Sequence, residues 1–366
     1  MTVHTEILLI AIAVSIACAI PGVFLVLRRM SMMADAITHT VFLGIVLAFF
    51  MTEDLNSPFL LVGATLVGVG TVWLTEMIHN TGLVNEDASI GIIFPLLFSI
   101  AIILVSLYSG NAHLDVDTAL LGEIAFAPFD RWIVNGTDLG PISLWISLGV
   151  ALINLILVML FYKELQLSTF DPLLAGLFGF MPALMHYVLM TMVSLTVVAS
   201  FQAVGAILVI GLMIGPAVIA YLWTDSVKAM LTSSIIIGII CAVVGTEVAF
   251  TMDVSIAGSI ATTIGIALII AVIATPKTGY IATYRRQRHL RRHYRETMML
   301  CHIYTHMDTP IAHVENGIGT IHEHLNWRPD YTHQAASQLK KQGLLYVANG
   351  HYVLTDKGIA QVKEII

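Results

Sequence analysis

The stretch ILLIAIAVSIACAIPGVFLVLRR (residues 7–29) decides the class of this protein. Residues 7–27 carry no charged side chain, and two arginines follow directly. At about 1.5 Å of rise per residue, a helix of this length crosses the roughly 30 Å hydrocarbon layer of a bilayer. We interpret it as an uncleaved membrane span and not as a signal peptide, because no basic segment precedes it and the apolar run continues past Cys18 to Arg28 and Arg29.

The rest of the chain extends this pattern. Hydrophobic residues make up 57% of the 366 residues and charged residues only 11%, which is too apolar for a soluble globular protein. The sequence therefore predicts an all-α polytopic membrane protein with about eight or nine transmembrane helices. Besides the first run, apolar segments of membrane-crossing length lie near 33–50, 59–78, 89–108, 142–162, 183–201, 203–223, 231–250 and 256–275.

The basic residues divide the chain into parts with different solvents. Residues 1–276 contain five of the 17 lysines and arginines, and the other twelve lie beyond them. We therefore expect a transmembrane domain at 1–276, a basic linker at 277–293 and a soluble domain at 294–366. Basic residues favour the cytoplasmic side. Nine spans place all the basic turns and the tail inside and the N-terminus outside.

On this topology the connection 109–141 faces outward and is acidic, so it would attract metal cations. Its apolar stretch Ala119–Phe129 fits either a short re-entrant helix or a surface loop with one amphipathic turn. The acidic residues of the connection are Asp115, Asp117, Glu123, Asp130 and Asp138.

The segment 163–182 is expected on the cytoplasmic side and contains a helix start signal. Asp171 is a good N-cap, and Pro172 suits the first helical position. Gly179 and Pro182 are typical of the end of a helix. The sequence predicts a short amphipathic helix that a cytoplasmic motor protein could contact.

Asp35 and His39 are the most informative polar pair within an apolar run. Their i, i+4 spacing places them on one helix face. A carboxylate inside a membrane span costs several kcal/mol unless it is paired, hydrated or bound to metal, so its presence indicates function. Carboxylate oxygen and imidazole nitrogen suit Mn²⁺, Zn²⁺ or Fe²⁺, and two facing chains would supply four ligands. The alternative is an Asp–His hydrogen bond within one helix.

Weaker candidates lie elsewhere. Glu247, near the outer end of a span, is a candidate for the metal path, although a structural role is the alternative for it. Residues 277–366 contain nine of the 14 histidines. Among them, His302 and His306 form an i, i+4 pair that could bind a regulatory metal, whereas scattered surface histidines are the alternative.

The tail has the element pattern of a winged helix-turn-helix domain. Helical stretches are predicted near 294–307, 311–325 and 331–343. A hairpin at 345–354 follows around Asn349-Gly350, a strong type I′ turn signal, and Thr355 caps a final helix. The sequence has no P-loop pattern, so we expect ATP hydrolysis in a separate chain.

Five segments in order along residues 7–276 resemble the zinc/manganese/iron family of ABC importer permeases. The resemblance implies the ABC importer permease fold, with metal bound by Asp35 and His39 in the translocation path. The family has a proline in the segment after this aspartate, and this sequence lacks it. The helix kink that such a proline would impose is therefore not expected here. The five segments are Leu27–His39, Glu86–Phe94, Phe170–Gly176, Val204–Ala217 and Asp253–Gly258.

The resemblance also implies function and partners. The chain would be a transport subunit, not an enzyme, in a prokaryotic cell (inner) membrane, with no permanently bound cofactor. It would import manganese, or alternatively zinc or iron. Its partners would be a cytoplasmic ATP-binding subunit, a second permease subunit, an extracytoplasmic metal-binding protein and membrane lipid. The segment that resembles the family's coupling helix, which docks on the ATPase, contains Asp171, Pro172, Ala175, Gly176 and Gly179.

The tail resembles the winged-helix region of manganese- and iron-dependent repressors, through Leu339–Leu345 and Leu354–Gly358, and this favours manganese. Its membrane tether argues against nucleic-acid binding, which leaves metal sensing, protein interaction or dimerisation. Two other functions remain open for the whole chain. One is a proton-coupled secondary metal carrier, in which Asp35 and His39 shuttle protons. The other is a membrane-anchored metal-sensing regulator.

Overall fold

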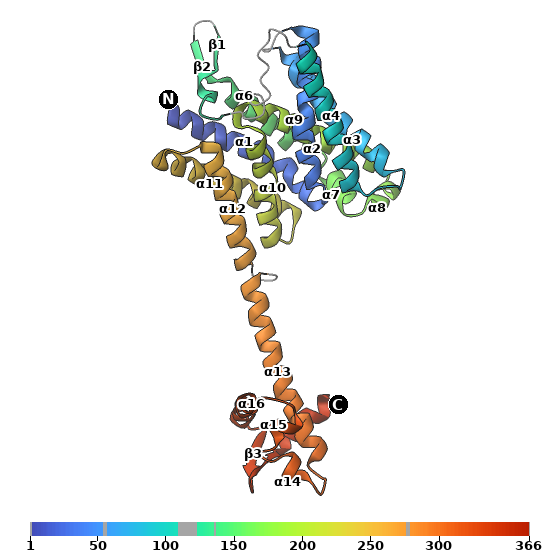
Figure 1. Cartoon of the computed structure of the whole chain (residues 1–366), viewed down its shortest axis with the longest axis vertical. Coiled ribbons are helices and arrows are strands. Elements are labelled where there is room, and N and C mark those ends of the chain that lie inside the picture. The colour runs from blue at the N-terminus through green and yellow to red at the C-terminus, as the bar shows by residue number, and fades with distance from the viewer. Residues whose placement is uncertain (1, 54–56, 109–122, 135–136, 276–278, 366) are drawn as a thin grey trace. The chain divides into compact units, whose positions relative to one another are not determined.

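The computed structural model describes residues 2–53, 57–108, 123–134, 137–275 and 279–365 (Figure 1). The chain divides into two compact units, Met1–Ile273 and Ala274–Ile366. We call them the membrane unit and the tail.

Nine helices of the described residues are long and apolar enough to cross a membrane. This confirms the prediction of a polytopic helical membrane protein with about eight or nine spans. The nine helices are α1 (Val3–Leu27), α2 (Ser31–Thr52), α3 (Pro58–His79), α4 (Glu86–Tyr108), α6 (Ile142–Leu160), α9 (Pro182–Val204), α10 (Ala206–Trp223), α11 (Val227–Met252) and α12 (Ile256–Ala274).

Two backbone turns separate spans that follow each other closely. Arg29 ends α1 in the left-handed conformation, with φ of 62°, and the Met30 N–H donates to the carbonyl of Leu25. This bond satisfies an orphan carbonyl at the helix end. Gly205, with φ of 78°, separates α9 from α10, in a conformation that glycine adopts without steric cost. The apolar sequence there therefore becomes two helices.

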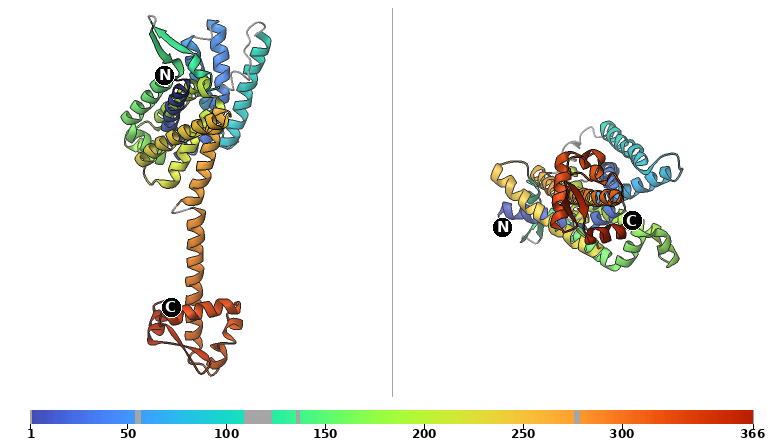
Figure 2. Two further views of the ribbon diagram at one scale, coloured as in Figure 1. Left: turned by 90° about the vertical axis from the view of Figure 1, so that its left-hand side faces the viewer. Right: turned by 90° about the horizontal axis from the view of Figure 1, so that it is seen from below.

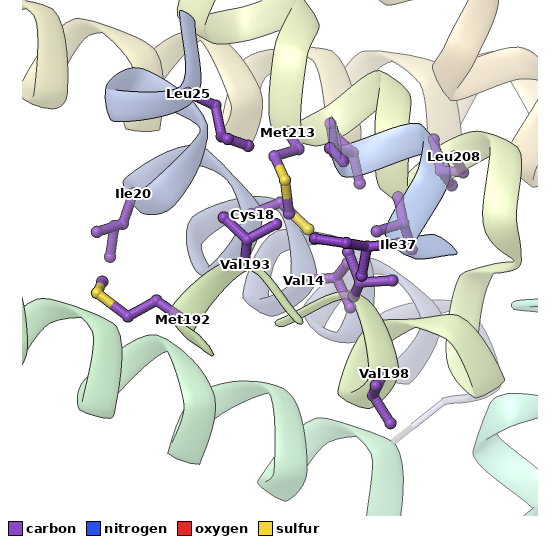
Figure 3. Close-up of a cluster of buried hydrophobic side chains, with 14 of the residues drawn as sticks. Val14, Cys18, Ile20, Leu25, Ile37, Met192, Val193, Val198, Leu208 and Met213 are labelled. Atoms are coloured by element: carbon purple, nitrogen blue, oxygen red, sulfur yellow. The ribbon is translucent and has the colours of Figure 1, made fainter. Parts of the chain in front are cut away.

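The core of the membrane unit surrounds α1. In α1, 78% of the most apolar stretch of the helix is buried, whereas the corresponding share is 22% in α4 and in α12. Helix α1 packs against α6, α9, α10 and α11. Side chains such as Val14, Ile37, Val193 and Leu208 come from four helices and meet in one buried cluster (Figure 3). The outer helices keep apolar side chains exposed, as a surface that faces lipid requires.

Helix α2 lies in close contact with α3 through a small residue. A Cβ atom added to Gly44 would lie 2.5 Å from the Cα of Ala64, so only glycine allows this approach. Nearby, the Thr71 hydroxyl of α3 donates to the Thr40 hydroxyl of α2 at 2.8 Å. These contacts fix the position of α2, which carries Asp35 and His39.

Shorter elements connect the spans. Strands β1 (Arg131–Val134) and β2 (Thr137–Pro141) pair antiparallel after a short 3₁₀ helix, η1 (Ala127–Phe129). They lie near the N-terminal end of α1 (Figure 2). This hairpin was not predicted, although Asn135-Gly136 is a turn signal of the same kind as Asn349-Gly350 in the tail. Of the stretch Ala119–Phe129, residues 119–122 lie outside the described residues, as do Asp115 and Asp117.

The connection after α6 contains two helices, α7 (Tyr162–Phe170) and α8 (Pro172–Leu177). The Asp171 carboxylate accepts the backbone N–H of Leu174 at 2.9 Å. Gly179 follows with φ of 82°. This confirms the predicted start of the short helix at Asp171-Pro172, whereas α7 was not predicted.

In the tail, α13 (Tyr280–His306) leads into a small unit with one apolar core. The basic residues that we assigned to a linker at 277–293 lie largely in the first half of α13. The single helix predicted near 311–325 is instead two short helices. The elements that follow α13 are α14 (Ala312–Glu315), α15 (Ile321–His324), α16 (Pro329–Lys341), β3 (Leu345–Ala348), β4 (His351–Leu354) and α17 (Asp356–Ile365).

The predicted hairpin and final helix of the tail are both present. Strands β3 and β4 pair in antiparallel register, and the turn residues Asn349 and Gly350 have φ of 48° and 80°. Positive φ at both positions is the type I′ geometry. The Thr355 hydroxyl accepts the backbone N–H of Gly358 at 3.1 Å, which caps α17. The winged-helix assignment of the whole tail stays a prediction.

Candidate functional site

The helical periodicity of α2 turns Asp35 and His39 away from the core. Ile37, between them in the sequence, is fully buried in the main hydrophobic cluster. A residue two positions away on an α-helix points about 200° around the axis. The anchoring of Ile37 therefore fixes the acidic and the imidazole side chains on the opposite face.

Asp35 and His39 lie side by side on that face. The distance from His39 Nε2 to Asp35 Oδ1 is 3.6 Å, and the two side chains are 31% and 43% exposed, respectively. A pair sealed within the protein would be buried, but this pair keeps an open side. One oxygen and one nitrogen ligand are half of a four-ligand metal site.

Two aromatic rings of α4 line the pair. The ring of His39 lies 5.1 Å from that of Phe94 and 6.0 Å from that of Phe98, between centroids. These rings restrict the orientation of the imidazole and shield one of its sides from water. Phe94 and Phe98 were not predicted as site residues, although an i, i+4 aromatic pair on a span is a signal visible in the sequence.

A polar network joins three helices at the same end of the membrane unit as the start of α2. Arg28, after α1, donates from Nη1 to Nδ1 of His186 on α9 at 3.3 Å. His186 Nε2 lies 2.8 Å from Glu76 Oε1 on α3, and the Tyr187 hydroxyl donates to Glu76 Oε2 at 2.6 Å. His186 Nδ1 therefore accepts from the arginine, whereas Nε2 faces the carboxylate at ion-pair distance without a hydrogen bond of good geometry.

The same arginine reaches the segment that precedes α8. Arg28 donates to the hydroxyls of Ser168 at 3.0 Å and of Thr169 at 3.1 Å, in the last turn of α7. The network therefore connects the end of α7, just before α8, to the turn between α1 and α2. This network was not predicted, although the carboxylate of Glu76 within the apolar run 59–78 is a signal of a functional group.

Helix α8 carries an exposed apolar surface. Leu173 and Leu177 are both 85% exposed, and Phe178 after them is 68% exposed, whereas Ala175 is fully buried. Apolar side chains grouped at an exposed surface are typical of a site that contacts a partner or the membrane. Of the predicted coupling residues, Asp171 caps this helix, and Ala175 faces inward.

Glu247 lies at a different place from Asp35 and His39. Its Oε1 atom is 3.3 Å from Nε2 of His4, at the N-terminal end of α1. The start of α2 follows the C-terminal end of α1, about 35 Å further along that helix at 1.5 Å per residue. The structure therefore does not bring Glu247 together with the pair on α2, and its role in the metal path stays a prediction.

Two acidic groups near the same end of α1 share one arginine. Arg131 donates to both carboxylate oxygens of the buried Glu6 at 3.2 Å, and its Nε lies 2.6 Å from Asp138 Oδ2. The backbone N–H of Gly140 and then the Arg131 guanidinium hold the pKa of Asp138 below its ordinary value. Part of the predicted acidity of this side is therefore neutralised.

In the tail the structure brings His302 and His306 together, with ring centroids 4.7 Å apart. Glu315 of α14 joins them, and one candidate ligand atom from each of the three residues lies within 4.8 Å of the others. Burial lowers the pKa of His302, which favours the neutral imidazole that can bind a metal. The cluster lies entirely within the tail.

Comparison with known proteins places the membrane unit among transporters. Residues 2–275 match the model of a family described as the ABC 3 transport family. The chain is 40% identical to the zinc transport system membrane protein TroD of Treponema pallidum over 356 residues, which cover 97% of this chain and 96% of the relative. It is 42% identical to the manganese transport system membrane protein MntD of Bacillus subtilis over 281 residues, 77% of this chain and 95% of the relative.

A solved structure is similar as well. A chain of PsaBC from Streptococcus pneumoniae, solved in complex with Fab, aligns with a TM-score of 0.65 at 29% identity. The alignment covers 78% of this chain and 96% of that one. The similarity to TroD is the broader one, because it includes the tail.

Proposed function

This chain belongs to the ABC 3 transport family, as a multi-pass permease subunit of a metal transporter, and from that premise we propose how it carries its ion. The cargo is a divalent transition-metal ion, manganese or zinc, with iron as a third candidate. The ion crosses a prokaryotic inner membrane between two permease subunits. The observation that carries this proposal is the half-exposed Asp35–His39 pair on α2.

The pair suits a site that two subunits share. Two copies, or this chain and a related one, would supply two carboxylates and two imidazoles. These are four ligands, and the two negative charges of the carboxylates balance the two positive charges of the ion. The open side of the pair is where a second subunit would contribute its ligands. The site would then exist in the dimer alone, which suits an ion that must be released again.

The choice between manganese and zinc rests on supply as well as on ligands. Carboxylate and imidazole accept both ions, and the order of intrinsic affinity favours zinc over manganese. MntD, whose name gives manganese, matches the membrane unit, whereas TroD, whose name gives zinc, also matches the tail. The tail therefore no longer favours manganese. An extracytoplasmic metal-binding protein would select the ion that reaches this site.

Energy would come from a separate cytoplasmic ATP-binding subunit that docks on α8. Its exposed leucines offer the apolar contact, and α7 joins α8 to the Arg28 network. A displacement of α8 would pull on the turn between α1 and α2, seven residues before Asp35. We therefore propose that the network transmits the ATPase movement to the metal site and that the tail lies in the cytoplasm.

Uptake by the reconstituted complex tests this function. Proteoliposomes that contain the permease, its ATP-binding subunit and the binding protein would be loaded with ATP and offered radioactive manganese or zinc, alone and in competition. The proposal predicts uptake of one of these ions that requires ATP and the ATP-binding subunit. Uptake driven by a proton gradient without that subunit would contradict it and favour a secondary carrier.

A further inference from the structure

Four metal-ligating side chains of the tail converge from three helices. His302 and His306 lie one turn apart on α13, Glu315 ends α14, and His324 ends α15. His324 Nδ1 lies 3.1 Å from Glu315 Oε2, and His302 Nε2 lies 3.9 Å from the same oxygen. The rings of His302 and His324 are stacked with centroids 6.2 Å apart. The carboxylate of Glu315 is therefore the common neighbour of the imidazoles.

Two of the separations in this cluster are close to those of a tetrahedral metal site. Metal–nitrogen distances of about 2.0–2.1 Å place the ligand atoms of a tetrahedron about 3.3–3.4 Å apart. The separations of His324 Nδ1 and His302 Nε2 from Glu315 Oε2 lie within about 0.6 Å of this value, and one candidate ligand atom each of His302, His306 and Glu315 lies within 4.8 Å of the others. Side-chain rotation, without backbone movement, could close such differences.

The scaffold holds these groups partly out of water. The side chains of His302 and Glu315 are only 13% and 18% exposed. The side-chain amide of Asn316, the residue after Glu315, donates to the carbonyl of Ile303 on α13 at 3.3 Å. His302 Nε2 also lies 3.2 Å from the Glu315 carbonyl, a hydrogen bond that the imidazole would exchange for the metal when it binds through this nitrogen. His302 and Glu315 are therefore held in place by the fold and are not mobile surface side chains.

We propose that His302, His306, His324 and Glu315 form a metal site that binds one divalent ion of borderline softness, zinc fitting best. Three imidazoles and one carboxylate form a tetrahedral set that suits zinc, whereas manganese prefers more oxygen ligands and an octahedral arrangement. The site differs in composition and location from the shared Asp35–His39 pair. The candidate membrane spans among the described residues all lie before Thr275, so an ion held in the tail would act on the tail and would not be in transit.

Metal binding would order the tail. Helices α14 and α15 contain four residues each, too few for a helix to be stable by itself. An ion shared by α13, α14 and α15 would tie both short helices to the long one. The conformation of the tail would then report the concentration of free zinc on its own side of the membrane.

Zinc binding by the purified full-length chain tests the proposal. Equilibrium dialysis with radioactive zinc would use an Asp35→Ala/His39→Ala background, which removes the pair in the membrane unit. We expect one zinc ion to remain bound per chain. Adding Glu315→Ala or His306→Ala should weaken this binding at least about tenfold, given that even indirect changes around a metal cost 10–100-fold. Adding His333→Ala, at an exposed histidine of α16, should leave it unchanged.

Cobalt substitution distinguishes a lost ligand from a lost fold. Co²⁺ in a tetrahedral site gives strong visible absorption, which the background protein should show and the Glu315→Ala and His324→Ala variants should lose while their thermal melts without metal stay unchanged. Equal zinc affinity in all variants, or a cobalt spectrum that survives both substitutions, would overturn the proposal. The assay measures binding and not uptake, so it does not depend on the proposed transport function.

Discussion

Substitution of Gly44 by alanine should disturb the proposed metal path without touching either proposed ligand, Asp35 or His39. The new Cβ would lie 2.5 Å from Ala64 Cα and 2.6 Å from the Gly63 carbonyl oxygen. Carbon atoms pack at about 3.5–4.0 Å, so α2 and α3 must separate by about 1 Å. Backbone atoms cannot rotate away, and overpacking of this kind costs about 1–3 kcal/mol. Gly44 is five residues after His39, about 7.5 Å along the helix.

The matched control is Gly70→Ala on α3, where an added Cβ meets nothing within 4 Å. We expect Gly44→Ala to lower the melting temperature of the purified permease by several degrees and to reduce metal uptake by the complex several-fold. Gly70→Ala should match the wild type in both, or melt slightly higher, because alanine favours a helix by about 0.5–1 kcal/mol. Equal behaviour of the two variants would refute the argument that close α2–α3 packing positions the site.

Three further predictions concern coupling and pH. Glu76→Gln removes the charge that pairs with His186, so uptake per ATP hydrolysed should fall several-fold while the complex still assembles; an unchanged ratio would exclude the network from coupling. Leu173→Asp places a charge on the exposed face of α8 and should prevent co-purification of the ATP-binding subunit, which retained binding would contradict. The lowered pKa of Asp138 means that its contribution to stability is present above the ordinary aspartate pKa and disappears as pH falls through the lower folded value. Acid melts of wild type and Asp138→Asn should therefore converge, and curves that stay parallel would contradict this.

Most of the fold could be predicted from local sequence features. The apolar runs and their flanking arginines indicated the spans, because hydrocarbon thickness sets helix length and unpaired backbone polar groups are excluded from lipid. Asp171-Pro172 and Asn349-Gly350 indicated a helix start and a turn because their effects are local. The break between α9 and α10 was predicted between residues 201 and 203, and the structure places it at Gly205.

The composition of the site was only partly predictable. The spacing of Asp35 and His39 indicated that they share a face. The contacts of His39 with Phe94 and Phe98, and the Arg28 network, depend on which helices pack together. No local sequence pattern specifies that packing. Glu76 and His186 are far apart in sequence, so only the packing of α3 against α9 reveals their contact. The same holds in the tail, where Glu315 and His324 complete a cluster that began as a histidine pair.

The most direct test of the central claim is metal uptake by the complete complex with Asp35→Ala or His39→Ala, with ATPase activity recorded alongside. His79→Ala, at an exposed histidine after the apolar part of α3, serves as the control. The account predicts that both site variants assemble with the ATP-binding subunit but lose uptake, whereas the control transports normally. Normal uptake by both site variants would reduce the pair to helix packing and move the metal path to other residues, with Glu247 the first to test.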